Sequence, residues 1–224
     1  MFNFFKKKKN KAKVNINSVS VPTFGWNKVE ENDSRIVWVN PEQSALISLN
    51  FFDLQPDLPT IKDVDFLRNF YRKNVISAKG GIIEVSLLDI HNTPSVKTIL
   101  KIPQPESGMT YIASVTIPFE NCSFVVKVQT AEVDITGVRD SFILSKLLGT
   151  GEITFDDNGI QNWFEDPYDP TIKEGTPMNK SEQEQYDAEF PHHPLSVARA
   201  LIIQAVQKIK FNPEINDLSD FKPS

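Results

Sequence analysis

The stretch IIEVSLLDI at residues 82–90 is the first of four strand-like segments, and the next three are SVKTILKI at 95–102, MTYIASVTI at 109–117 and CSFVVKVQT at 122–130. Each segment is rich in β-branched residues, and short links containing Pro, Asn or Gly separate them. Links this short favour antiparallel pairing of consecutive strands. These residues therefore predict an antiparallel meander.

The third segment shows how this sheet is oriented. Apolar side chains alternate with hydroxyl-bearing ones, so one face carries Met109, Tyr111, Ala113, Val115 and Ile117. Successive side chains of a strand point to opposite faces of the sheet. One face is therefore expected to lie on a core, while the other can be exposed to water.

The segments before the meander predict two more strands and a helix. RIVWV at 35–39 and SALISLNFF at 44–52 are separated by Asn40-Pro41, which favours a hairpin. A capping-box pattern at Thr60 and Asp63 precedes apolar residues at helical spacing up to Val75. We expect this helix to cover the sheet and to end at Gly80-Gly81.

After the meander, Thr136 is expected to cap a second helix, which ends at Gly149 and turns inward Val138, Phe142, Ile143 and Leu147. Residues 152–190 are acidic and interrupted by prolines, which predicts an excursion that contains a short helix at 181–190. The last helix is predicted at 195–210, with Pro194 in its first turn.

The fold class predicted from these elements is α+β. An antiparallel sheet of about six strands is flanked by helices, with an acidic excursion and a C-terminal helix added. We divide the chain into a basic flexible arm at 1–20, an α+β sandwich domain at 21–150, and an appendage at 151–224 packed on the same domain. A chain of 224 residues is long enough to bury such a core.

Composition and charge favour a cytoplasmic protein. One cysteine cannot form an internal disulfide, no basic region followed by an apolar run marks a signal peptide, and no apolar run approaches the roughly 20 residues of a membrane span. The net charge is −5. Nucleic acid is not expected as a partner, because the dense basic patch is confined to the terminal arm and phosphate binding needs an extended basic face.

Residues that could carry catalysis or bind a metal have stronger structural interpretations. His192 and His193 are adjacent between Pro191 and Pro194, and an extended chain would point their rings to opposite sides, so a role at the start of the helix is favoured. Cys122 opens an apolar strand, where cysteine usually packs as a small hydrophobic residue. The sequence contains no nucleophile elbow, phosphate loop or zinc-protease motif, and we expect no catalytic residue, metal site or cofactor.

The acidic excursion mixes large rings with carboxylates. Its turn Asp156–Gly159 departs from a calcium loop and favours a tight turn. A surface of rings and negative charge suits docking to a basic protein, and the candidate partner-binding residues are Trp163, Phe164, Glu165, Asp166, Tyr168 and Asp169. The alternative is that these rings pin the excursion to the core.

Two resemblances add expectations to this interpretation. Over about residues 22–150 the order strand, strand, helix, four strands, helix, with Trp26 and Trp38 near its start, resembles the Mog1/PsbP-like fold family. That resemblance implies a binding scaffold. The string YDAEFPHHPLSVARALI resembles the tails of uncharacterised bacterial proteins, which raises the hypothesis of an immunity protein for a secreted toxin and transfers no functional residue.

Three functions therefore stay open. The leading hypothesis is a non-catalytic protein-binding module, in its specific form an immunity protein that neutralises a basic toxin. The second is a small-ligand-binding protein or enzyme with a cleft near His192/His193, between the sheet and the C-terminal helix. The third is an adaptor that associates with an anionic membrane surface through the lysine arm at residues 6–13 and the phenylalanines beside it. The oligomeric state does not follow from the sequence.

Overall fold

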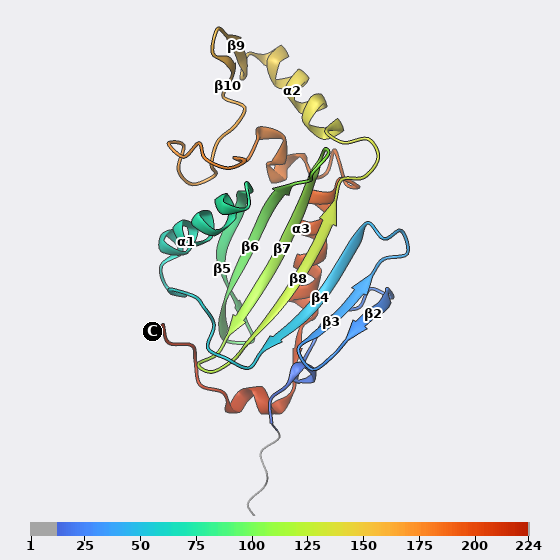
Figure 1. Cartoon of the computed structure of the whole chain (residues 1–224), viewed down its shortest axis with the longest axis vertical. Coiled ribbons are helices and arrows are strands. Elements are labelled where there is room, and N and C mark those ends of the chain that lie inside the picture. The colour runs from blue at the N-terminus through green and yellow to red at the C-terminus, as the bar shows by residue number, and fades with distance from the viewer. Residues whose placement is uncertain (1–12, 224) are drawn as a thin grey trace, which may run out of the picture.

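The computed structural model describes residues 13–223. Its centre is a seven-stranded antiparallel sheet with the order β2-β3-β4-β8-β7-β6-β5 (Figure 1). The strands are β2 (Asn27–Glu31), β3 (Arg35–Val39), β4 (Ala45–Phe52), β5 (Gly81–Ile90), β6 (Thr93–Pro103), β7 (Met109–Pro118) and β8 (Ser123–Ala131). The predictions of an α+β fold, of the hairpin β3-β4 and of the meander β5 to β8 are confirmed.

Strand β2 is the strand of this seven-stranded sheet that the sequence did not reveal. Its residues NKVEE contain a single apolar side chain, Val29, which is 62% exposed. The strand lies at one edge of the sheet and pairs only with β3, with a bulge between Lys28 and Glu30. Charges and bulges on an edge strand discourage pairing with other chains. Such a strand has no apolar alternation from which it could be predicted.

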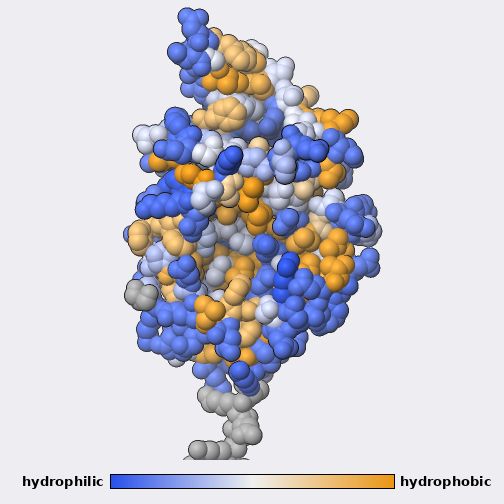
Figure 2. Space-filling model, in the orientation of Figure 1, coloured by the Kyte–Doolittle hydropathy of each residue, from blue (hydrophilic) through white to orange (hydrophobic). Residues whose placement is uncertain are grey.

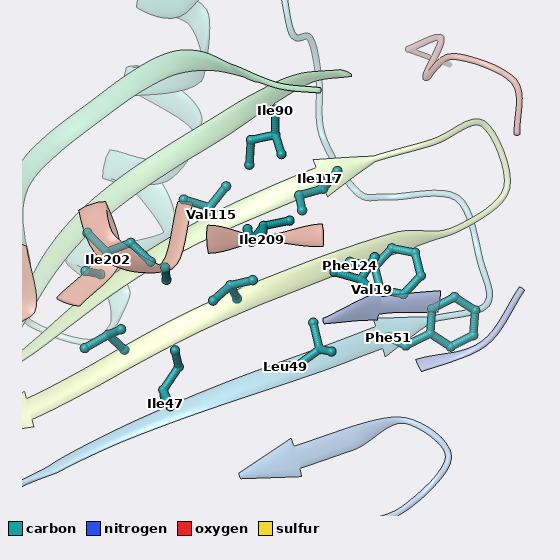
Figure 3. Packing of buried hydrophobic residues seen from close by; sticks show 14 of the residues in the cluster. Val19, Ile47, Leu49, Phe51, Ile90, Val115, Ile117, Phe124, Ile202 and Ile209 are labelled. Atoms are coloured by element: carbon teal, nitrogen blue, oxygen red, sulfur yellow. The ribbon is translucent and has the colours of Figure 1, made fainter. Parts of the chain in front are cut away.

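The main core lies between the sheet and helix α3 (Pro194–Lys208), which runs behind β7 and β8 in Figure 1. The helix predicted at 195–210 is confirmed, and it buries a stripe of Leu195, Ala198, Ile202 and Ala205. Alternate side chains of the strands meet this stripe, and Figure 3 shows several of them around Ile202. Burial of apolar area is the dominant favourable contribution to folding, so this layer holds the molecule together.

Helix α1 (Val64–Ser77) packs on the opposite face of the sheet, over β5. Its Leu67 and Val75 form a second cluster with Val85 and Val96. The helix cap is Asp63, whose side chain accepts a hydrogen bond from the Phe66 amide, and not Thr60. No described helix covers β8, β4 and β3 on this face (Figure 1).

Helix α2 (Val138–Thr150) corrects the predicted inward face. Ile143 and Leu147 are buried as expected, but Val138 is 54% exposed and Phe142 is 58% exposed. The third buried residue is Arg139, and Gly137 rather than Thr136 precedes the helix. The reason is the location of α2, which lies beyond the end of the sheet and packs on the excursion instead of on the strands (Figure 1).

The arm predicted at residues 1–20 needs a correction in its described part. Residues 1–12, which carry most of the lysines of this arm, lie outside the described residues. A 3-10 turn η1 (Ile16–Ser18) and strand β1 (Val19–Ser20) follow, and β1 pairs with β11 (Lys210–Phe211). Ile16 and Val19 are buried in the main core, so residues 16–20 belong to the folded body.

The segment after α2 consists of short elements. These are β9 (Thr154–Asp156), β10 (Gly159–Gln161), η2 (Lys180–Glu182), η3 (Glu184–Tyr186) and, after β11, η4 (Pro213–Asp217). The turn predicted at residues 156–159 joins β9 to β10. The helix predicted at 181–190 is wrong, because two 3-10 turns take its place and the capping box lies at Asn179 and Glu182. Among the described residues, no helix combines the length and the apolar character needed to cross a bilayer.

Buried charges connect this segment to the sheet. The ammonium of Lys101 on β6 lies 2.6 Å from the carboxylate of Glu182, and both side chains are 1% exposed. Glu182 also accepts a hydrogen bond from the hydroxyl of Tyr111 on β7. Arg139 donates to the carbonyls of Ser181 and Gln183. A buried charge is tolerated only when it is paired and hydrogen-bonded, and these contacts satisfy that requirement.

Candidate functional site

A groove of about 680 Å³ opens where the sheet ends and α3 begins. Its walls are the start of β4 with the preceding turn, the end of β8 with the loop 131–138, and residues 189–201. Apolar side chains from all three walls line it, among them Trp26, Val133, Phe190, Val197 and Leu201. Ligand sites in proteins are concave, mostly apolar and of about 300–1,000 Å³. The groove therefore has the dimensions and lining of a binding site.

Two prolines and two histidines shape one wall of the groove. Pro194 occupies the first turn of α3, and His193 is its N-cap, with Nδ1 accepting a hydrogen bond from the Leu195 amide at 3.2 Å. The predicted role at the helix start is confirmed for this histidine. His192 is exposed and also lines the groove.

Glu132 connects residues of the facing wall through its carboxylate. Its carboxylate accepts hydrogen bonds from the Met109 and Gly137 amides, each at 2.9 Å, and lies 3.6 Å from Nε2 of His193. Burial opposes the charged form, but the contacts with His193 and the two amides outweigh it and lower the pKa of Glu132. Both histidine nitrogens and both carboxylate oxygens are thus engaged in holding the walls.

Four exposed apolar side chains border the groove, and we call them the apolar rim. They are Val133 at 58% exposure, Ile135 at 81%, Val138 at 54% and Phe142 at 58%. The first three line the groove, and Phe142 packs edge-on against Phe190, which lines it too. Contiguous exposed apolar side chains mark interaction sites more often than isolated ones do.

The charge near the apolar rim is negative. A second hollow of about 490 Å³ shares Glu132 and Val133 with the groove and adds Glu106 and Asp134. Glu189 lines the groove and pairs with Lys146 at 3.0 Å. The guanidinium of Arg139 contributes little positive potential there, because its side chain is 0% exposed and bonded within the protein. Of these carboxylates, Glu106 and Asp134 have no ion-pair partner among the described residues, so a ligand that approaches this end meets their charges.

The residues predicted to bind a partner lie elsewhere, in the excursion. Trp163 is 4% exposed and packs with Ile143, Leu147, Ile153 and Tyr186. Phe164 is 48% exposed, and Glu165 is exposed beside it. The structure therefore places one of the two neighbouring rings in a core and the other at the surface.

Asp166 is buried and forms a bidentate ion pair with Arg72 of α1, with distances of 2.9 Å and 2.8 Å. Burial raises the pKa of Asp166, but the bonds from Arg72 and from the amides of Tyr168 and Asp169 outweigh it and lower that pKa. This carboxylate attaches the excursion to α1 and does not face solvent.

The last two predicted residues also have partners within the chain. The Tyr168 hydroxyl accepts a hydrogen bond from the Val85 amide at 2.8 Å and donates one to its carbonyl at 3.3 Å, which covers part of the free edge of β5. The Arg68 guanidinium lies 3.7 Å above the Tyr168 ring. Asp169 accepts hydrogen bonds from the amide and hydroxyl of Thr171. Of the six candidates, Phe164 and Glu165 keep side chains that are exposed and free of such bonds.

Cys122, the other residue considered for catalysis, is a core residue, as expected from the sequence. It is 4% exposed and belongs to the main core. Burial raises the pKa of its thiol to about 11. A thiol that stays protonated at neutral pH is a poor nucleophile, so Cys122 acts as a core residue.

No protein-family model and no curated protein sequence matches the chain. Among solved structures, the Ran-binding protein Mog1p of Saccharomyces cerevisiae overlaps with a TM-score of 0.43 and 11% identity over 87% of this chain and 90% of that one. PsbP from Synechocystis sp. PCC 6803 overlaps with a TM-score of 0.36 and 13% identity over 57% of this chain and 79% of that one.

A crystal structure from Bacteroides thetaiotaomicron overlaps with a TM-score of 0.34 and 12% identity over 53% of this chain, which spans 40% of that protein. The Mog1/PsbP-like proteins expected from the order of elements are thus among the structures that this chain resembles. At TM-scores below 0.5, the resemblance transfers neither a partner nor the role of any residue.

Proposed function

We propose that this chain is a non-catalytic protein-binding module and that its partner docks in the groove and on the apolar rim. The observation that carries the proposal is the coincidence of a 680 Å³ apolar hollow with Val133, Ile135 and Val138, which remain more than half exposed at its mouth. Interfaces are built around a desolvated apolar centre with a polar border. The groove and its rim supply both parts.

The chemistry of the partner follows from the charge of this end. Glu106 and Asp134 line the hollow beside the apolar rim, so a segment with apolar anchors flanked by Lys or Arg would complement it. A cationic toxin is one partner of this kind, and the immunity hypothesis is that specific form of the proposal. Growth arrest by the partner expressed alone, relieved by co-expression of this chain, would support the toxin form.

Two titratable side chains of the groove, His193 and Glu132, already make contacts within the chain, which favours a binding role over catalysis by this pair. His193 caps α3 and faces Glu132, while Glu132 holds the Met109 and Gly137 amides. A general base needs a free nitrogen or oxygen within reach of a substrate proton. Neither side chain offers one without giving up a contact that supports a wall.

A test uses partners captured from the native host and then purified. We expect affinity for the true partner to fall at least about tenfold in the Ile135→Asp and Val138→Asp variants, as for loss of a central apolar contact, and to weaken with salt. Leu54→Asp is the matched control, because Leu54 is 60% exposed and lies outside the groove. Unchanged affinity in both rim variants would refute the proposal.

The second candidate function, binding of a small ligand, is favoured by one observation. The cleft predicted between the sheet and the C-terminal helix is present, and His192 and His193 both line it. Titration with a neutral apolar dye such as Nile red measures directly whether the groove binds a small ligand. Saturable binding of the dye that Leu201→Trp abolishes, without any protein partner sensitive to Ile135→Asp, would favour the small-ligand function.

The adaptor hypothesis depends on residues 1–13, and all but Lys13 lie outside the described residues.

A further inference from the structure

The face of the sheet opposite α3 carries a row of polar side chains, of which Ser48 and Thr98 are buried and Ser114 and Lys127 are half-buried. Lys127 in β8 pairs with Ser48 of β4 on one side and with Ser114 of β7 on the other, and Ser114 pairs with Thr98 of β6. Directly paired residues of neighbouring strands place their side chains on the same face. The half-buried Lys127 is thus flanked by hydroxyl groups in the middle of the sheet.

Lys127 has no acidic partner among residues 13–223, although the molecule carries excess negative charge. Burial lowers the pKa of Lys127, and the nearby guanidinium of Arg35 lowers it further. Arg35 itself lies 3.5 Å from Glu30, while its Nε is buried without a hydrogen-bond partner. Two cations therefore share this face, and donor groups on both remain unused.

One pair of neighbouring hydroxyl groups leaves a further proton available. Ser48 is not part of it, because it accepts a hydrogen bond from the Asn50 side chain at 3.0 Å and is 0% exposed. Thr98 and Ser114 share one hydrogen bond of 2.8 Å, so one of their two hydroxyl protons is unused. Several donors beside two positive charges suit an oxyanion, which accepts many hydrogen bonds and prefers charged donors.

We propose that the part of this face between α1 and β3 binds an oxyanion, a phosphate or carboxylate group, at a site centred on the half-buried Lys127 with Arg35 and Ser114 as further donors. Figure 1 shows this face toward the viewer, and Figure 2 shows hydrophilic and apolar residues mixed over it. None of these three residues lines the groove, so the site is independent of the proposed function.

The experiment titrates the full chain with inorganic phosphate, with acetate, and with vesicles that contain phosphatidic acid or phosphatidylcholine alone. Chloride keeps the ionic strength constant, and amide chemical shifts of residues 48, 114 and 127 are followed by nuclear magnetic resonance. We expect saturable shifts with at least one anionic probe. Phosphate, acetate or phosphatidic acid as the effective probe distinguishes a free phosphate, a carboxylate or a lipid headgroup as the source.

Four variants make the result specific. Lys127→Met keeps the length of the side chain and removes the charge, and we expect it to weaken binding at least about tenfold, as loss of a charge-assisted hydrogen bond does. Lys127→Arg should restore most of the affinity. Lys73→Met, at an exposed position of α1, and Val138→Asp, in the groove, should leave binding unchanged. Wild-type protein without a saturable response to any probe, or equal affinity in Lys127→Met, would overturn the site.

Discussion

Glu182 shows how one buried carboxylate joins two parts of the chain. It accepts hydrogen bonds from the Lys101 ammonium at 2.6 Å, the Tyr111 hydroxyl at 3.1 Å and the Asn179 amide at 2.8 Å. In the sequence, Glu182 is one acid of the acidic excursion at 152–190, and acidic residues are rarely buried unless they are paired. Lys101 and Tyr111 are 81 and 71 residues away, so no local pattern could reveal these two partners.

Glu182→Gln is expected to lower the free energy of unfolding by about 3–5 kcal/mol, because the Lys101 charge stays buried without a counter-charge. Urea denaturation monitored by circular dichroism measures it. The double variant Lys101→Met/Glu182→Gln is the control and should lose less than the single variant. A loss below about 1 kcal/mol in the single variant, typical of exposed ion pairs, would show that the pair is not buried as described.

The ion pair of Asp166 predicts in which direction the stability of the fold changes with pH. Its pKa is lower in the folded protein than the ordinary value of about 3.9, since the Arg72 and amide bonds outweigh burial. Such a group stabilises the fold above the ordinary value, and this stabilisation is lost as pH falls through the folded pKa. We expect the stability advantage of wild type over Asp166→Asn to be constant from pH 5 to 8 and to shrink below about pH 4. An advantage that is constant down to pH 2 would contradict the assignment.

At the scale of elements, α3 depends on its histidine cap. His193→Ala should lower the free energy of unfolding by about 1 kcal/mol, because the Leu195 amide loses its acceptor. His193→Asn should retain most of the stability, since asparagine accepts the same kind of bond at an N-cap. Thermal and urea unfolding of the three proteins measure this. Equal losses in both variants would indicate that packing against Tyr111, not capping, is the role of the ring.

Two substitutions in helix α2 test which of its apolar faces points inward. Val138→Lys should change the free energy of unfolding by less than about 0.5 kcal/mol, as expected for an exposed site. Ile143→Lys places a charge in the cluster with Trp163 and should prevent stable folding. The two proteins are compared by urea denaturation. A large loss in Val138→Lys would mean that the apolar rim is buried.

The elements differ in how far sequence could predict them. Strands β5 to β8 were predictable because alternation, β-branched residues and short turns all agree. Helix α2 was placed correctly, but its inward face was not, because periodicity offers two apolar faces and only tertiary position decides between Ile143 and Phe142. Strand β2 was missed because its residues show no apolar alternation. The 3-10 turns at 180–186 were missed because Lys101 and Tyr111, which bind Glu182, are distant in the chain.

At the scale of the whole molecule, the candidate site was predicted only in part. The proximity of His192 and His193 to a cleft was anticipated as an alternative, while the partner surface was expected in the excursion. Two contacts attach that excursion to the body. Asp166 binds Arg72, 94 residues away in the chain, and Tyr168 binds Val85, 83 residues away. Val133 and Ile135 gave no signal, because two apolar residues in a loop acquire meaning only once the groove beside them is known.

Photo-crosslinking in the native host tests the location of the docking surface most directly. A photoreactive phenylalanine analogue is placed at position 135 in the apolar rim and, in a separate protein, at position 164 in the excursion, since both side chains are exposed. We expect a covalent adduct with one partner protein from position 135, lost when Val138→Asp is added, and none from position 164. An adduct from position 164 alone, or from neither position, would contradict docking at the groove.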